Sequence, residues 1–135
     1  MDIRQQTVGS IRVISLHGDL DSRSSPGAQE QILPALPENG RVLLDLSDVP
    51  FISSAGLRSM LLIYRQAQCV NSTVALLGLS DELRGVLSAT GFLGFFIVVD
   101  SLTEGVEALR AEATGPLEAG PEPAWPTELR RSDAR

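Results

Sequence analysis

The chain has 135 residues, of which 43% are hydrophobic and 4% aromatic, and its formal net charge is −6. This length suits one domain, or one domain with a tail, and the apolar fraction is enough for a core of Leu, Val, Ile and Ala. The negative charge argues against a protein that binds nucleic acid or docks on an anionic membrane surface.

The first half of the chain is expected to form two strands, a short helix and a third strand. Thr7–His17 alternates around Gly9-Ser10, which is typical of a β-hairpin or of two neighbouring strands. The Ser-Ser-Pro of residues 24–26 resembles a helix start, and the prolines at 34 and 37 limit this helix to a few turns. Arg41–Leu46 is nearly continuously apolar, which predicts a central strand covered on both faces.

The second half alternates helices with strands. A helix over about Ala55–Gln68 is predicted, with Arg58 and Leu62 on the side opposite its apolar stripe. The residues of this stripe are Leu57, Met60, Leu61 and Tyr64. A strand within residues 72–80, a helix over 81–90 capped by Ser80, a strand over 95–100 and a helix after Ser101 complete the pattern.

The order β-β-α-β-α-β-α-β-α predicts an α/β fold, with a mixed, mostly parallel sheet of about four or five strands and about four helices. We expect one domain over residues 1–114. From Gly115 the apolar periodicity stops, and residues 115–135 are rich in Pro, Gly and charge, which indicates a disordered C-terminal tail. Trp125 is isolated in this tail and is interpreted as an incidental residue rather than a docking motif.

The sequence offers little support for catalysis. Gly56 is the only glycine in the turn after the third strand, which does not match a nucleotide-binding loop. His17 is the only histidine and is interpreted as a strand-end residue, so neither a metal site nor a base for a serine nucleophile is indicated. Asp19 and Asp21 lie in a turn, where aspartate is common. We therefore expect no enzymatic activity and no cofactor; a small enzyme with Ser54 as nucleophile is the less favoured alternative.

Other classes of protein are also disfavoured. One cysteine, Cys69, excludes an internal disulfide and a Cys-rich metal site. Neither a leader-like segment nor an apolar run of membrane-spanning length is visible, so we expect a cytoplasmic protein without membrane contact.

Two adjacent serines, Ser53 and Ser54, lie where the third strand gives way to the following helix. Either could cap the helix by accepting a hydrogen bond from a free N–H of its first turn. One cap needs one residue, however, and Ala55 and Gly56 leave the turn without bulky side chains, so that another protein could approach. A phosphate is also tolerated beside the positive end of a helix. Capping alone thus leaves one serine unexplained.

Three segments together resemble STAS domains, the family of anti-sigma factor antagonists. "VLLDLSDVPFISSAGLRSMLL" resembles the family signature, "ISLHGDLDSRSS" its GELD element, and "LSATGFLGFFIVVDSLTEGVEAL" its C-terminal helix-strand-helix. The resemblance spans roughly residues 5–112, and the combination in this order is specific. It implies a STAS-type fold.

The resemblance also implies partner switching in the regulation of transcription. A family antagonist binds an anti-sigma factor that is a serine kinase of the GHKL type, is inactivated by phosphorylation at this helix start, and is restored by a PP2C-like phosphatase. The usual motif is Asp-Ser-Ser/Thr-Gly-Leu. Ser54 matches the modified serine, and Ser53 replaces the aspartate, which makes Ser53 the alternative acceptor. Asp21 and Asp45 match the family's loop and strand-end aspartates.

The implied partner-binding surface consists of Asp19, Asp21, Ser53, Ala55, Gly56, Arg58 and Leu62. Leu62 is the sharper test, because an apolar residue on a polar helix face is more often explained by a partner than by the core. The alternative within the family is a STAS scaffold or transporter subunit that is never phosphorylated, in which Ser54 would only cap the helix.

Overall fold

The computed structural model describes residues 1–114, in which five strands form one sheet in the order β1-β2-β3-β4-β5. The strands are β1 (Asp2–Val8), β2 (Ile11–His17), β3 (Arg41–Asp48), β4 (Thr73–Leu77) and β5 (Ile97–Val99). β1 pairs antiparallel with β2, and all other neighbours pair parallel. The predicted mixed, mostly parallel sheet is therefore confirmed. The predicted tail, with Trp125, lies outside the described residues.

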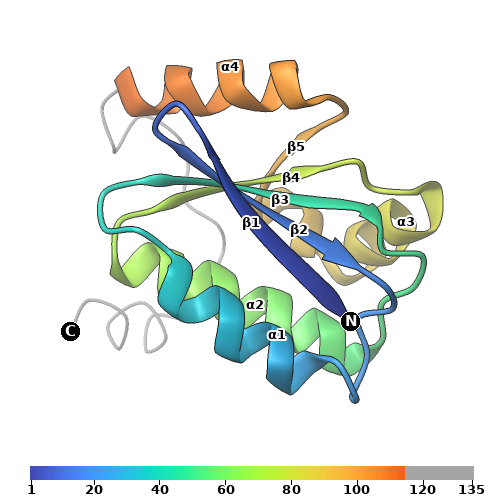
Figure 1. Ribbon diagram of the computed structural model, residues 1–135. Helices are drawn as coiled ribbons and strands as arrows, with labels where there is room; N and C mark the ends of the chain where they lie inside the picture. Colours follow the sequence, from blue (N-terminus) through green and yellow to red (C-terminus); the bar gives the residue numbers. More distant parts are fainter. Residues whose placement is uncertain (115–135) are drawn as a thin grey trace.

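Helices cover both faces of this sheet (Figure 1). They are α1 (Ser25–Ile32), α2 (Ser54–Cys69), α3 (Asp81–Thr90) and α4 (Leu102–Thr114), with short 3-10 turns at η1 (Leu33–Ala35) and η2 (Phe92–Phe95). Residues of α1, α2 and α3 share one apolar cluster on one face, and α4 closes a second, smaller cluster on the other. The order of elements follows the order predicted from the sequence.

The central position of β3 is confirmed. Leu43 and Leu44 are both fully buried but belong to different clusters, Leu43 on the α4 side and Leu44 on the side of α1 and α2. Successive side chains of a strand point to opposite faces, so a strand between two helical layers has to be apolar throughout. The predicted hairpin is also confirmed, and β1 begins at Asp2, earlier than expected, because pairing with β2 extends to His17.

The buried face of α2 differs from the predicted stripe. Its buried residues are Gly56, Ser59, Met60, Ile63, Tyr64 and Ala67. Leu61 is only half-buried and joins neither apolar cluster, so its assignment to the core was wrong. The small residues Gly56, Ser59 and Ala67 face inward because they allow close packing. At this contact Gln29 Nε2 of α1 donates a hydrogen bond to the fully buried Ser59 Oγ at 2.8 Å.

The C-terminal elements are capped as predicted, but β5 is shorter. Ser80 Oγ accepts the Leu83 N–H at 3.1 Å, and Gly91 ends α3 with a φ of 82°, in the left-handed region that glycine favours. The predicted strand over residues 95–100 keeps only Ile97–Val99. Phe95 lies in η2 instead, and its ring stacks on Tyr64 with centroids 5.3 Å apart. The apolar character of Phe95 therefore reflects core packing, whereas that of Ile97–Val99 accompanies strand pairing with β4.

Candidate functional site

Ser53 and Ser54 occupy different positions at the start of α2. Ser53 is the N-cap, with extended backbone (φ −95°, ψ 178°), and its Oγ accepts the Gly56 N–H at 3.3 Å. Ser54 is the first helical residue, and its side chain is exposed. Its hydroxyl makes no hydrogen bond within residues 1–114. The capping role, which the sequence left open between the two serines, thus belongs to Ser53, while Ser54 presents a surface hydroxyl.

Two loops meet at this helix start, both at the carboxyl ends of parallel strands. The Leu20 N–H donates to the Phe51 carbonyl at 2.9 Å, and the Ser53 N–H donates to the Leu20 carbonyl at 3.0 Å. Leu20 and Ile52 form an isolated parallel bridge. We call this arrangement the loop clasp, formed by residues 19–21 and 51–53. It places the loop after β2 directly against the first turn of α2.

Gly56 of α2 packs against this clasp and does not lie on an open surface. It is buried, and a Cβ built on it would lie 2.3 Å from the Leu20 carbonyl oxygen and 2.7 Å from Ile52 Cγ1. The expectation that Gly56 contacts a partner therefore needs correction. Its missing side chain makes room for the backbone of Leu20, while the neighbouring Ala55 is half-buried.

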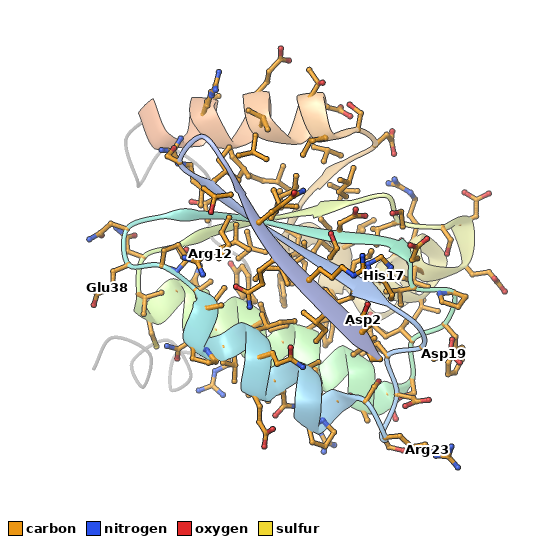
Figure 2. All side chains as sticks on the ribbon, viewed as in Figure 1. Asp2, Arg12, His17, Asp19, Arg23 and Glu38 are labelled. Atoms are coloured by element: carbon orange, nitrogen blue, oxygen red, sulfur yellow. The ribbon has the colours of Figure 1, made fainter. Side chains whose placement is uncertain are left out.

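The two aspartates of the loop after β2 have different surroundings. Asp21 Oδ1 accepts the backbone N–H groups of Arg23 at 3.0 Å and Ser24 at 3.2 Å. These bonds, that from Ser24 first, lower the pKa of Asp21 from its ordinary value of 3.8. Asp19 is exposed, and its carboxylate has no ion pair or hydrogen bond in the described part of the chain. Figure 2 shows Asp19 and Arg23 at the end of the molecule where α1 begins. Asp19 is therefore the carboxylate free to meet a partner.

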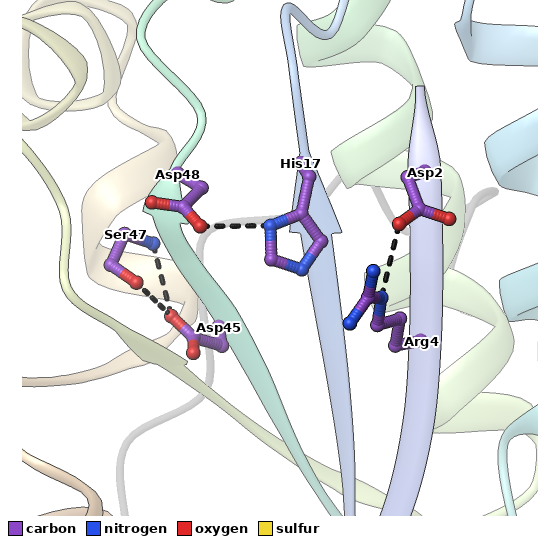
Figure 3. A network of polar contacts seen from close by, with 6 residues as sticks. All are labelled: Asp2, Arg4, His17, Asp45, Ser47 and Asp48. Atoms are coloured by element: carbon purple, nitrogen blue, oxygen red, sulfur yellow. Dashed lines mark hydrogen bonds and ion pairs between the residues drawn. The ribbon is translucent and has the colours of Figure 1, made fainter.

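A polar network lies beside these loops, where β2 and β3 end (Figure 3). His17 Nδ1 lies 2.8 Å from Asp48 Oδ2, and the Gly18 N–H donates to the Asp48 carbonyl at 3.0 Å. Asp45 Oδ1 accepts from the backbone N–H of Ser47 at 3.0 Å and from its hydroxyl at 2.6 Å. His17 is the last residue of β2, which confirms its interpretation as a strand-end residue, and its contact with Asp48 ties the ends of β2 and β3 together.

Asp45 does not face the two serines. It lies two residues after Leu43, so both side chains point to the sheet face that α4 covers. Ser54 belongs to α2, which packs on the opposite face. The aspartate at this position is therefore a residue of β3 whose carboxylate accepts hydrogen bonds from Ser47, on the face of the sheet opposite to Ser54.

The outward side of α2 carries Ser54, Arg58 and Leu62 in one row, each four residues from the next. Arg58 is exposed and has no ion pair among residues 1–114. Leu62 is half-buried and joins neither apolar cluster, in agreement with its predicted place on the outer side. It lies about 12 Å along the helix from Ser54.

One residue of this surface was missed by the sequence analysis. Phe51 directly precedes the bridge residue Ile52, and its side chain is 54% exposed. It was not singled out in the sequence analysis. A signal was present, because Pro50 and Phe51 stand next to the serines in a loop, where an apolar residue has no strand or helix face to bury it.

Within residues 1–114, no group of three or more His, Cys, Asp or Glu side chains could hold a metal ion. None of the helices within residues 1–114 is long and apolar enough to span a bilayer. The candidate site is thus a surface that presents the hydroxyl of Ser54 and two charged groups, the carboxylate of Asp19 and the guanidinium of Arg58. The apolar side chains of Phe51 and Leu62 lie on its outer side.

Comparisons with known proteins place this surface in context. A family model described as STAS domain matches residues 2–105. BtrV, a candidate anti-sigma factor antagonist of Bordetella bronchiseptica, is 28% identical over 111 residues, covering 82% of this chain and 96% of BtrV. The phosphorylated form of the Bacillus cell fate determinant SpoIIAA has a similar structure, with a TM-score of 0.62 and 20% identity over 81% of this chain and 100% of SpoIIAA.

The same fold occurs in a protein of another class. A sulfate transporter family protein from Wolinella succinogenes gives a TM-score of 0.68 at 17% identity, over 78% of this chain and 89% of that chain. Since both solved structures are distant in sequence, they show a shared fold and leave the function to be argued from the residues of the site.

Proposed function

The chain belongs to the STAS domain family, and from this premise we propose that it is an anti-sigma factor antagonist that acts by partner switching. Its partner is an anti-sigma factor with serine kinase activity of the GHKL type, in the cytoplasm. Phosphorylation of Ser54 by that kinase breaks the complex, and a PP2C-like phosphatase restores it. The names of BtrV, as a candidate antagonist, and of SpoIIAA, as a phosphorylated protein, support this proposal.

The observation that carries the proposal is that the hydroxyl of Ser53 caps α2, whereas the hydroxyl of Ser54 is exposed. The Ser53 hydroxyl is engaged as the cap of α2, and a kinase would have to disturb this contact, worth about 1 kcal/mol to the helix, before it could transfer a phosphate to Ser53. The Ser54 hydroxyl is exposed and makes no hydrogen bond among the described residues. A kinase therefore reaches Ser54 without breaking any contact of the fold, which favours Ser54 over the alternative acceptor Ser53.

A phosphate on Ser54 is compatible with the folded chain. It adds close to two negative charges at neutral pH, and the helix N-terminus stabilises an anion by about 0.3–1 kcal/mol. Arg58 follows four residues later, and side chains at this spacing are about 5–6 Å apart at Cβ. The phosphate can therefore pair with Arg58, which withdraws this cation from any partner that used it.

The phosphate on Ser54 is expected to weaken the complex with the kinase, although the folded chain tolerates it. A dianion within an interface has to lose its water, and it meets groups that faced a neutral hydroxyl. Shifting an equilibrium from 1:99 to 99:1 takes about 5.5 kcal/mol, and a buried phosphate together with the loss of Arg58 can supply most of it. The partner surface extends from Asp19 and Ala55 to Arg58 and Leu62.

Binding of a charge variant tests this function. Ser54→Asp adds one charge at the proposed centre of the interface and should weaken binding to the GHKL-type kinase at least tenfold. Ser10→Asp is the matched control, because Ser10 is exposed in the β1–β2 turn at the other end of β2 and already accepts a hydrogen bond from Arg41 Nη2 at 2.8 Å. Equal effects of the two variants would show that net charge, and not the site, controls binding.

A further inference from the structure

Phe51 is an exposed aromatic side chain at the edge of the proposed interface. Its side chain is 54% exposed, although it stands in a chain with few aromatic residues, 4% of the total. Pro50 beside it is exposed as well, so the two form a small apolar tip on the loop between β3 and α2. Resting on the function proposed above, we infer that Phe51 is the apolar anchor of the kinase complex and inserts into an apolar pocket of the kinase.

The backbone below this side chain is held in place on both sides. The Phe51 carbonyl accepts the Leu20 N–H at 2.9 Å, and Ile52 forms a parallel bridge with Leu20. Buried Val49 precedes the tip, with its N–H donating to Leu46 at 3.0 Å. A large side chain on a fixed backbone loses little conformational entropy on binding, and aromatic residues of this kind dominate protein interfaces.

The charges around the tip indicate the chemistry of the pocket. Asp19, in the loop joined to Phe51 through Leu20, carries a free and exposed carboxylate. The whole chain is acidic, with a net charge of −6. An apolar pocket with a basic rim is therefore complementary to Phe51 and its surroundings. A second copy of this chain would instead bring another acidic loop to the same place, which argues against self-association through the tip.

The position of the tip also connects it to the switch. Phe51 and Ser54 are three residues apart, which limits their separation to about 11 Å along the chain. An anchor stabilises a complex only where water is excluded around it, whereas a phosphate keeps its water strongly. Phosphorylation of Ser54 therefore acts on the same water-free patch that Phe51 requires.

Titration against GHKL-type serine kinases from the host organism, each purified singly, tests the anchor. Phe51→Ala should raise Kd about 30-fold or more, the size of a hot-spot contact, with an unchanged thermal unfolding midpoint. Leu102→Ala is the matched control, because Leu102 is 41% exposed and begins α4 on the other face of the sheet, and it should change Kd less than about twofold. If Phe51→Ala is poorly folded, Phe51→Leu replaces it. The Kd of Phe51→Leu should be higher than the Kd values of wild type and Leu102→Ala, without complete loss of binding.

A double-mutant cycle tests the link to Ser54. Because both residues act on one patch, Ser54→Asp should weaken binding by a smaller factor in the Phe51→Ala background than in wild type. Independent, multiplying effects would overturn the link. Wild-type affinity in Phe51→Ala would overturn the anchor while leaving the proposed function intact. The anchor would also be overturned if wild type formed dimers that Phe51→Ala dissociates, because Phe51 would then bind a second copy of the chain. If wild type bound none of the kinases, the proposed function itself would be overturned.

Discussion

Gly56→Ala tests the loop clasp, because it adds one methyl group at the point where α2 touches the loop after β2. The new Cβ would lie 2.3 Å from the Leu20 carbonyl oxygen and 2.7 Å from Ile52 Cγ1, while ordinary contacts of a Cβ begin at 3.4 Å. The closer atom belongs to the backbone, and it also accepts the Ser53 N–H at 3.0 Å. The clash can therefore be relieved only by moving the helix start and the loop apart.

The expected cost follows from three contributions. Overpacking at a rigid contact costs about 1–3 kcal/mol, and weakening the Ser53–Leu20 hydrogen bond costs about 0.5–1.5 kcal/mol. Alanine is favoured over glycine within a helix by up to about 1 kcal/mol, which partly offsets the loss. The net effect is a destabilisation of about 2 kcal/mol.

Urea unfolding followed by circular dichroism measures this change against a matched control. Gly85→Ala is the same substitution within α3, at an exposed position where nothing lies within 4 Å of the added Cβ, and it should stabilise the protein by up to about 1 kcal/mol. The two substitutions should thus have opposite signs. A Gly56→Ala variant as stable as wild type would refute the clasp as described.

Five further substitutions test the rest of the account. Leu44→Ala, in the fully buried centre of β3, should cost about 2–5 kcal/mol in urea unfolding; a loss below 1 kcal/mol would contradict its central position. Ser53→Ala should cost about 1 kcal/mol in the same assay through loss of the cap, whereas Ser54→Ala should change stability by less than about 0.5 kcal/mol. Because folding lowers the pKa of Asp21 from 3.8, its ionised form stabilises the fold above about pH 4, and this contribution disappears as the pH falls through the lowered pKa. The stability difference between wild type and Asp21→Asn, measured across acidic pH, should therefore shrink on acidification, and a difference that grows would contradict the bonding of this carboxylate. Leu62→Ala should weaken kinase binding in a titration without lowering the unfolding midpoint; the reverse pattern would place Leu62 in the core.

The fold was predictable because its main signals are local. The apolar run of β3, the alternation on either side of Gly9 and the serine cap of α3 each specify an element within a few neighbouring residues. Burial then agreed with hydrophobicity, as for Leu44, and the order of elements followed. Where hydrophobicity and burial disagree, the prediction failed: Leu61 was assigned to the core, while the small residue Ser59 occupies it.

The details of the site depend on contacts between segments far apart in the sequence. Gly56 was interpreted as open to a partner, because its contact with the Leu20 carbonyl is invisible until the two loops are placed together. Asp19 and Asp21 were both assigned to the partner surface, and only the path of the loop turns the carboxylate of Asp21 onto backbone N–H groups. Phe51 was not singled out, although it stands beside the serines in a loop and is exposed. The assignment of Ser54 as phosphoacceptor remains a prediction.

Mapping the phosphate on this chain tests the central claim most directly. Wild type, Ser53→Ala and Ser54→Ala are incubated with ATP and the GHKL-type kinase that binds the wild type, and intact mass with peptide sequencing locates the modification. The exposed, unbonded hydroxyl of Ser54 predicts one phosphate on wild type and on Ser53→Ala, and none on Ser54→Ala. A phosphate on Ser53, or on Ser54→Ala, would contradict the division of work between the two serines from which the switch is argued.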